Sequence, residues 1–261
     1  MLAVFEHEIA RPPPEFGIHA GCKVPQSRPE MAELFAGEFP GSTFYNFTNG
    51  NFMALSHENQ KPSYPRCMVV MDNMFCVFNG ELKNICELRR HYGLSRHANE
   101  AILVLEMYKV LRDRAPYPAD QVVKDLVGEF AFVLFDASTQ SLFLARDGDG
   151  GVSFFWGMAE DGSMVMSDNS EIVLDICGQA TAYFPQGCLY TNNGGLVSYT
   201  HPMHKVKAEV TRDVNGDPFS VFFHVDLSVR LPSIPRVGSA DNWAGYPVPA
   251  AAGTGSAPII P

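Results

Sequence analysis

Long apolar runs are missing from this sequence, and none approaches the roughly 18 residues that a helix needs to cross a bilayer. The first ten residues contain Glu6 and Glu8 and lack the basic segment and apolar stretch of a secretory signal. Residues 243–261 carry no charge, but their prolines and glycines prevent a continuous helix. We therefore expect no membrane insertion and a cytoplasmic location, with the nucleus left open as a second compartment.

Positive charge is also scarce. The sequence has 19 lysines and arginines against 29 acidic residues, which gives a net charge of −10. Nucleic-acid backbones attract the opposite sign of charge, so no nucleic-acid partner is expected. The six cysteines include no Cys-x-x-Cys pair. In a chain without a secretory signal, such cysteines are expected to be reduced thiols.

Metal ligands in a suitable pattern are lacking too. The segment Asp147-Gly148-Asp149-Gly150-Gly151 has the start of a calcium loop, but its twelfth position is Met158 where a carboxylate is needed. His201 and His204 flank a proline without a nearby carboxylate or thiolate. The sequence predicts a hairpin turn at residues 147–151 and a solvent-facing loop around His201 and His204. No metal and no cofactor are expected.

Apolar residues are plentiful, at 46% against 18% charged, which is typical of a globular protein. The first part of the chain predicts a strand at Leu2–Phe5 and a helix after Ser27. Two hairpins follow, with turns at Asn49-Gly50 and Asp72-Asn73.

The apolar period then changes to that of helices between residues 85 and 126, and the period of a strand returns from Phe130. Several of the later strands are apolar without alternation, which predicts sheets covered on both faces. This order indicates one α+β domain over residues 1–230. Residues 231–261 form a Pro/Gly/Ala-rich tail that cannot build a core of its own.

The segment Val77-Phe78-Asn79-Gly80-Glu81-Leu82 resembles the strand-to-helix Asn-Gly-Glu element of class II glutamine amidotransferases. The likeness is best seen in the glutaminase domain of asparagine synthetases. Further segments resemble that domain in the same order along the chain, at residues 87–93, 99–103, 128–136, 145–147, 167–171 and 184–187. Collinear segments over about two thirds of the chain are far more specific than one motif.

Two shorter strings narrow the resemblance. His91-Tyr92-Gly93-Leu94 and Leu111-Arg112-Asp113-Arg114 resemble the signatures of the plant aluminium-induced proteins with YGL and LRDR motifs, relatives of stem-specific and auxin-repressed proteins. The resemblance implies a four-layer αββα sandwich of the N-terminal-nucleophile hydrolase type. It also implies a response to aluminium stress or to a hormone.

An amidotransferase of this class attacks with the thiol of an N-terminal cysteine, whose own α-amine acts as the base. The resemblance places Leu2 at this position, which has no nucleophile and is large enough for the initiator Met1 to be retained. The arginine and aspartate that hold the two ends of glutamine in the family fall on Ala54 and Ala98. No catalytic residue is therefore expected, because nucleophile and orienting charges are both lost.

Asn79 and Gly80 stand where the family places the two donors of its oxyanion hole, and we expect them to be vestigial. The residues alone equally allow a tight turn, with Gly80 at positive φ and Asn79 as a helix cap. Cys22, close to His19 and Lys23, could act as a substitute nucleophile. It is disfavoured because cleavage before it would remove the first strand.

These losses indicate a catalytically silent amidotransferase-like protein that works as a binding or assembly module. Three alternatives stay open: a hydrolase or amidotransferase with altered chemistry at Asn79 and Gly80, a sensor of a small metabolite, and a structural homo-oligomer. We expect homo-oligomers in which the tail lies across a subunit interface, since Trp243 and Tyr246 are unfavourable in water.

The ancestral pocket is expected to be less polar than in active relatives. Met1 and Leu2 would fill part of it, and the alanines at positions 54 and 98 remove opposing charges. Asn79 and Gly80 would then bond to backbone or water, since buried donors need partners.

Overall fold

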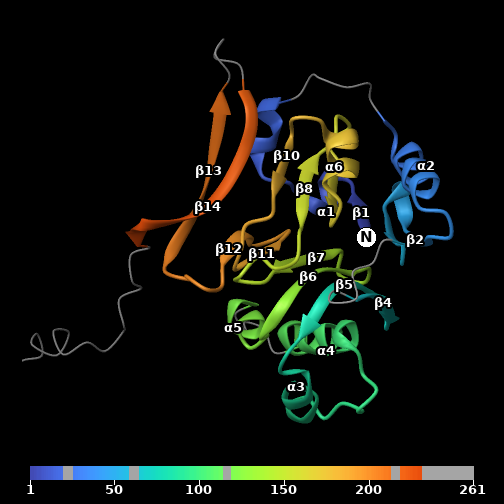
Figure 1. Ribbon diagram of the computed structural model, residues 1–261, viewed down its shortest axis with the longest axis vertical. Coiled ribbons are helices and arrows are strands. Elements are labelled where there is room, and N and C mark those ends of the chain that lie inside the picture. The colour runs from blue at the N-terminus through green and yellow to red at the C-terminus, as the bar shows by residue number, and fades with distance from the viewer. Residues whose placement is uncertain (20–25, 59–64, 114–118, 213–217, 231–261) are drawn as a thin grey trace, which may run out of the picture. The chain divides into compact units, whose positions relative to one another are not determined.

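Two six-stranded antiparallel sheets, packed face to face, form the centre of the computed structural model (Figure 1). The first sheet contains, in order across it, β10 (Thr181–Tyr183), β8 (Phe155–Met158), β9 (Met164–Ser167), β1 (Leu2–Phe5), β3 (Phe52–Leu55) and β2 (Thr43–Asn46). The second contains β12 (Gly195–Ser198), β11 (Cys188–Thr191), β7 (Ser141–Arg146), β6 (Gly128–Asp136), β5 (Met74–Leu82) and β4 (Arg66–Met71). The structure describes residues 1–19, 26–58, 65–113, 119–212 and 218–230, so Cys22 and the tail 231–261 lie outside the described residues.

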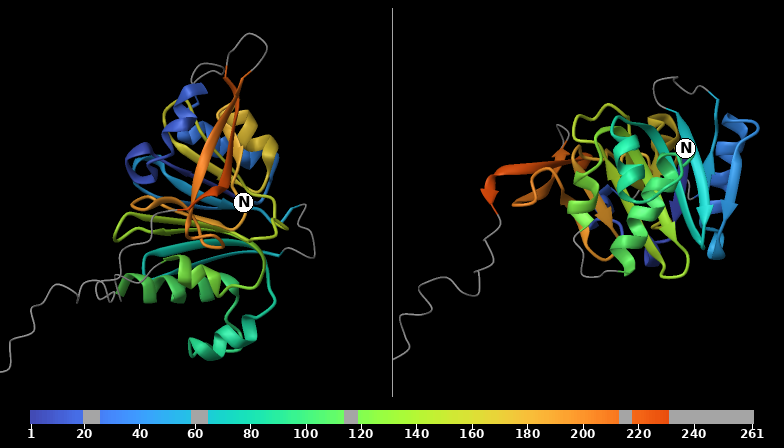
Figure 2. Two further views of the ribbon diagram at one scale, coloured as in Figure 1. Left: turned by 90° about the vertical axis from the view of Figure 1, so that its left-hand side faces the viewer. Right: turned by 90° about the horizontal axis from the view of Figure 1, so that it is seen from below.

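Helices cover the outer face of each sheet, as Figure 2 shows. The first sheet is covered by α2 (Arg28–Glu38) and α6 (Ser170–Cys177), and the second by α3 (Ile85–His91), α4 (Glu100–Asp113) and α5 (Ala119–Lys124). The expected four-layer αββα sandwich of the N-terminal-nucleophile hydrolase type is thereby confirmed. Within the described ranges, no helix is both long and apolar enough to cross a membrane.

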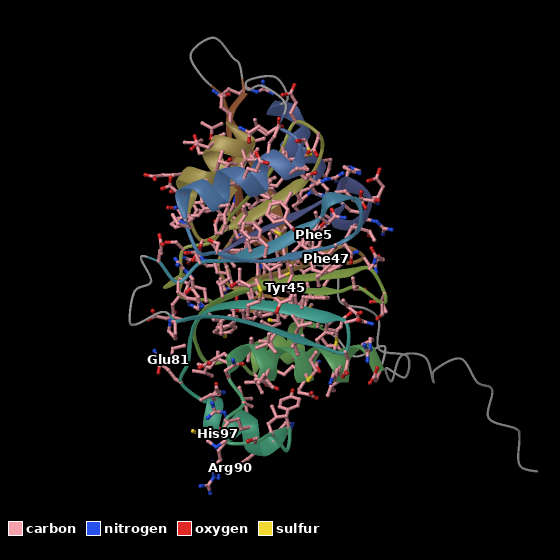
Figure 3. The ribbon with its side chains drawn as sticks, turned by 90° about the vertical axis from the view of Figure 1, so that its right-hand side faces the viewer. Phe5, Tyr45, Phe47, Glu81, Arg90 and His97 are labelled. Atoms are coloured by element: carbon pink, nitrogen blue, oxygen red, sulfur yellow. The ribbon has the colours of Figure 1, made fainter. Side chains whose placement is uncertain are left out.

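Three apolar clusters fill the three interfaces between these layers. All four residues of β1 are buried: Ala3 and Phe5 face the second sheet, and Leu2 and Val4 face the helices. Figure 3 shows Phe5 and Phe47 between the sheets, and their ring centroids lie 5.9 Å apart. Burial of a side chain of this size contributes about 1.5–3 kcal/mol to the free energy of folding. A strand that is apolar on both faces therefore stabilises two interfaces between layers.

Local sequence explains why the strands and helices begin where they do. At the start of α2, the backbone N–H of Ser27 donates to Glu30 Oε2 at 2.6 Å, which closes a capping box. The turn between β4 and β5 places Asp72 and Asn73 at φ angles of 51° and 61°, as a two-residue hairpin requires. This turn fixes a register in which Arg66 lies opposite Asn79.

The remaining elements are α1 (His7–Ala10), the 3₁₀ turns η1 (Pro14–His19) and η2 (Thr48–Gly50), and a separate hairpin of β13 (His204–Arg212) and β14 (Pro218–Arg230). Neither β10 nor β13 is predicted from the sequence. The loop expected around His204 is wrong, because this residue begins β13 and its Nδ1 lies 3.1 Å from the carbonyl oxygen of Asp226. The alternation of half-buried Val206, Ala208 and Val210 with exposed residues is the missed signal of a strand covered on one face.

Candidate functional site

The predicted nucleophile position lies at the start of the central strand β1. Leu2 is 1% exposed, and its side chain belongs to the apolar cluster under α2 and α6. Ala54 lies directly opposite Leu2 in β3 and is fully buried. Ala98 lies before α4, where its carbonyl oxygen accepts a hydrogen bond from Arg89 Nε at 2.7 Å. The structure thus brings together two of the three substituted positions in an apolar setting.

Asn79 and Gly80 lie inside β5, so the interpretation as a tight turn with a helix cap is wrong. Gly80 has a φ of +123°, and a Cβ atom there would lie 2.0 Å from the carbonyl oxygen of Glu129 in β6. The close approach of the two strands therefore requires glycine. The backbone N–H of Gly80 donates to the carbonyl oxygen of Pro65 at 3.0 Å.

Asp168, directly after β9, gathers three donors around its buried carboxylate. The α-amine of Met1 is 2.6 Å from Oδ1, and Arg66 Nε is 2.6 Å from Oδ2. The side-chain amide of Asn79 donates to Oδ2 at 2.9 Å. The side chain of Asp168 is only 3% exposed, so this network forms a shielded polar centre at the end of β9 and the start of β1, close to the end marked N in Figure 1.

Neighbouring groups hold the members of this network in place. Arg66 Nη1 donates to the carbonyl oxygens of Ser56 and Glu58 at 3.2 and 3.1 Å. Burial lowers the pKa of the Met1 α-amine below its ordinary value; the charge of Arg66 acts in the same direction and that of Asp168 opposes it. Asn79 Oδ1 is buried and has no hydrogen-bond partner among the described residues.

A cavity of about 460 Å³ opens beside the Asp168 network. Met1, Arg66 and Asp168 form its charged part. Its other walls combine aromatic side chains with hydroxyl and carboxylate groups: Phe35, Phe39, Phe155, Tyr183, Ser56, Ser153, Ser170, Glu58 and Glu171. Aromatic walls around a few convergent polar groups are typical of small-molecule sites.

The expectation of a less polar pocket is therefore wrong. Positions 54 and 98 carry no charge, but Arg66 and Asp168 bring charges to the cavity. Neither residue is predicted from the sequence to belong to a site. Met1 lines the cavity, but Leu2 points into the apolar cluster instead. The Asn79 amide donates to a carboxylate, whereas the N–H of Gly80 donates to a backbone carbonyl oxygen, as expected.

Arg66 could have been found from the sequence. The turn at Asp72-Asn73 fixes the pairing of β4 with β5, and counting outward from it places Arg66 opposite Asn79. Asp168 lies within a segment that resembles the amidotransferases, but no local pattern indicates its pairing with β1 and β4. That pairing depends on contacts between residues more than a hundred positions apart.

The arrangement limits the chemistry that the site can perform. An oxyanion hole needs free donors aimed at the developing negative charge. Here the backbone N–H of Gly80 and one of the two N–H groups of the Asn79 amide have acceptors within the protein, and the acceptor of Asn79 is itself a carboxylate. In the part of the chain that the structure describes, no group of three or more histidine, cysteine or acidic side chains is placed to hold a metal ion.

Comparison with known proteins places the chain among plant sequences. A family model described as "Aluminium induced protein" matches residues 2–225. Stem-specific protein TSJT1 of Nicotiana tabacum is 58% identical over 149 residues, which cover 56% of this chain and 100% of that protein.

Similarity to amidotransferases is weaker. Asparagine synthetase B of Escherichia coli is 27% identical over 127 residues, covering 47% of this chain and 22% of that protein. The Brassica oleracea asparagine synthetase is 31% identical over 121 residues, covering 45% and 19%. The chain thus spans about a fifth of the length of these synthetases. The structure of glutamine phosphoribosylpyrophosphate amidotransferase from B. subtilis matches 75% of this chain and 47% of that chain, with a TM-score of 0.44 and 14% identity.

Proposed function

We propose that this chain, which belongs to the aluminium-induced protein family, is a catalytically silent amidotransferase-like protein that works as a binding module in plant stress or hormone responses. The binding site in this proposal is the cavity beside Asp168, and the ligand is a small polar molecule. Assembly into homo-oligomers is the second part of the proposal.

The engagement of both oxyanion donors carries the proposal. The amide of Asn79 is held by Asp168, and the N–H of Gly80 by the carbonyl oxygen of Pro65. A tetrahedral intermediate at this place would put its negative charge beside a carboxylate, which opposes the stabilisation that catalysis needs. The other substituted positions also argue against catalysis. Leu2 supplies no nucleophile, and Ala54 and Ala98 supply no charges that could orient a substrate.

A small-metabolite sensor is the alternative that the cavity favours. An ammonium group carries three donors, and the Met1 α-amine has one acceptor, Asp168 Oδ1, among the described residues. Together with the side chains of Ser153 and Ser170, these donors can bind a polar ligand. The same convergence of charged groups would also suit altered chemistry, but the engaged N–H of Gly80 and the carboxylate beside the Asn79 amide argue against it.

Ammonia release from glutamine tests the catalytic part of the proposal. We expect no release above that of heat-killed protein, and none from Leu2→Cys, because a restored thiol still lacks oriented substrate and free oxyanion donors. Enzyme-dependent ammonia release that is lost in Asn79→Ala would overturn the proposal.

Calorimetric titration tests the binding part. Glutamine is expected not to bind, because alanines occupy both positions that hold its charged ends in the family. Small polar metabolites that do bind should bind more weakly to Ser170→Ala, and equally well to Ser228→Ala, whose hydroxyl lies in β14 outside the cavity. Equal binding by both variants would place the ligand elsewhere.

A further inference from the structure

A second cavity, of about 420 Å³, lies along β14 and β10. Its walls come from the ends of β7 and β10, the segments that follow them, the segment after β12, and β14. Tyr183 lines both this cavity and the one beside Asp168, and the other described lining residues differ. The volume falls in the range of about 300–1,000 Å³ found for small-molecule sites.

Arg146 supplies a buried positive charge to this cavity. The residue is 5% exposed, and its guanidinium donates to the carbonyl oxygens of Val152, Phe184 and Gly150 at 2.8, 2.7 and 3.1 Å. These three bonds engage three of the five N–H donors of the group. Among the described residues, the two remaining donors have no acceptor.

The adjacent carboxylate does not form an ion pair with this arginine within the described ranges. Asp147 instead accepts hydrogen bonds from the backbone N–H groups of Phe130, Gly150 and Gly151. Burial lowers the pKa of the Arg146 guanidinium, and the charge of Asp147 only opposes this effect. Because a buried charge is stabilised chiefly by an opposite charge with hydrogen bonds, Arg146 is poised for an anion.

The rest of the cavity wall fits an anion with an apolar part. No carboxylate side chain is among its described lining residues, while His201 and His224 are. The Nδ1 atom of His224 is buried without a described partner, whereas its Nε2 lies 3.6 Å from Glu209 Oε1. The wall also has an apolar part that includes Phe222 and Leu227, and the ring of Phe222 stacks on that of His224 with centroids 5.8 Å apart.

We propose that this cavity binds a small organic carboxylate, with its charged group against Arg146 and its apolar body against Phe222 and Leu227. A neutral apolar molecule would leave the two remaining donors of the guanidinium without an acceptor, and a cation would be repelled by its charge. A compact polyanion such as inorganic phosphate would leave the apolar wall uncovered. This site is independent of the proposed function at Asp168.

Calorimetric titration of the full chain with hexanoate, hexan-1-ol and hexylammonium tests the proposal. We expect saturable binding of hexanoate at one site, at least tenfold tighter than that of the alcohol, and no binding of the ammonium compound. Equal affinity for hexanoate and hexan-1-ol would overturn the proposal, because the charge would then contribute nothing.

A pair of charge-introducing variants locates the site without disturbing the bonds of Arg146. Leu227 and Leu174 are 61% and 53% exposed, so both tolerate a polar side chain, but only Leu227 lines this cavity. We expect Leu227→Asp to weaken hexanoate binding at least tenfold and Leu174→Asp to leave it unchanged. If the two variants behave alike, the ligand does not occupy this cavity. Circular dichroism of both variants verifies that they are folded.

Discussion

At the residue scale, Asp168 does more than any other single side chain to define the candidate site. Its two oxygens accept from an ammonium, a guanidinium and an amide that come from three different strands or their flanks. One buried negative charge therefore faces two positive ones. Such a centre is stable only while each charge keeps its partner.

Replacing this carboxylate should destabilise the protein strongly. We expect Asp168→Asn to lower the free energy of unfolding by about 3–5 kcal/mol, because the Met1 α-amine and Arg66 lose their counter-charge while remaining buried. Urea denaturation measures the change. Asp72→Asn is the matched control: this exposed carboxylate pairs with Lys109 at the surface, and its loss should cost at most about 1 kcal/mol. Equal losses in both variants would contradict the importance of burial.

Buried thiols and phenols predict how stability depends on pH. Burial raises the pKa of Cys67 from 9.0 to about 11, that of Cys188 from 9.0 to about 12, and that of Tyr190 from 10.0 to about 12. The folded protein therefore keeps these protons at a pH where the unfolded chain releases them, so stability is lost as pH rises above about 9. Urea midpoints measured from pH 8 to 11 should fall steadily, and less steeply in Cys188→Ala. A flat profile over this range would show that these groups are not shielded.

At the element scale, the two signature strings of the sequence have structural roles. Gly93 ends α3 at a φ of +66°, and the N–H of Leu94 then donates to the carbonyl oxygen of Arg89 at 2.7 Å. In α4, Arg112 Nη1 donates to Asp136 Oδ2 at 3.3 Å. Asp136 is fully buried at the end of β6, so this contact ties the helix to the sheet that it covers.

Loss of the Arg112 contact should loosen α4. We expect Arg112→Met to lower the free energy of unfolding by about 1.5–3 kcal/mol, the contribution of a hydrogen bond to a charged group. The control is Arg90→Met in α3, whose side chain projects from the far end of the molecule in Figure 3 and should change stability by less than about 0.5 kcal/mol. An unchanged urea midpoint in Arg112→Met would show that apolar packing alone holds α4.

Local patterns were sufficient for most of the fold and for only part of the site. The hairpin turns at Asn49-Gly50 and Asp72-Asn73, the Ser27 cap and the apolar run of β1 act over a few residues, and the sequence predicts them correctly. The hairpin turn expected at residues 147–151 is wrong, because this segment joins β7 of the second sheet to β8 of the first. The convergence of Arg66 and Asp168 on Asn79 depends on the pairing of distant strands, which periodicity does not encode. Likewise, the local sequence allows a turn at Gly80. The requirement for glycine within β5 follows only from the close approach of the backbone of β6.

At the scale of the whole molecule, exposed apolar side chains gather around β14. Leu174, Tyr183, Phe222 and Leu227 are each more than half exposed, and Phe222 lines two adjoining cavities. Contiguous apolar surface of this kind is typical of sites of association. It supports the prediction that the protein forms homo-oligomers.

Sedimentation velocity tests this prediction. At micromolar concentration, the full chain should sediment as a species larger than the 28.7 kDa monomer. Deletion of residues 231–261 should weaken the association, because the sequence predicts that Trp243 and Tyr246 of the tail lie across the interface. A monomeric full-length chain, or a truncated chain that differs only by its lost mass, would refute the prediction.

The central position of β1 has a consequence for synthesis on the ribosome. Leu2 pairs with Ala54 on one side and with Ser167 on the other, so one neighbour of the strand is encoded about 160 residues later. At about 5–20 residues per second, translation needs roughly 8–30 s to produce that neighbour. Until then the apolar Leu2–Phe5 segment has one open edge and an incomplete layer above it. This central strand is therefore enclosed only after its distant neighbour has been synthesised, and its open apolar edge needs protection from association until then.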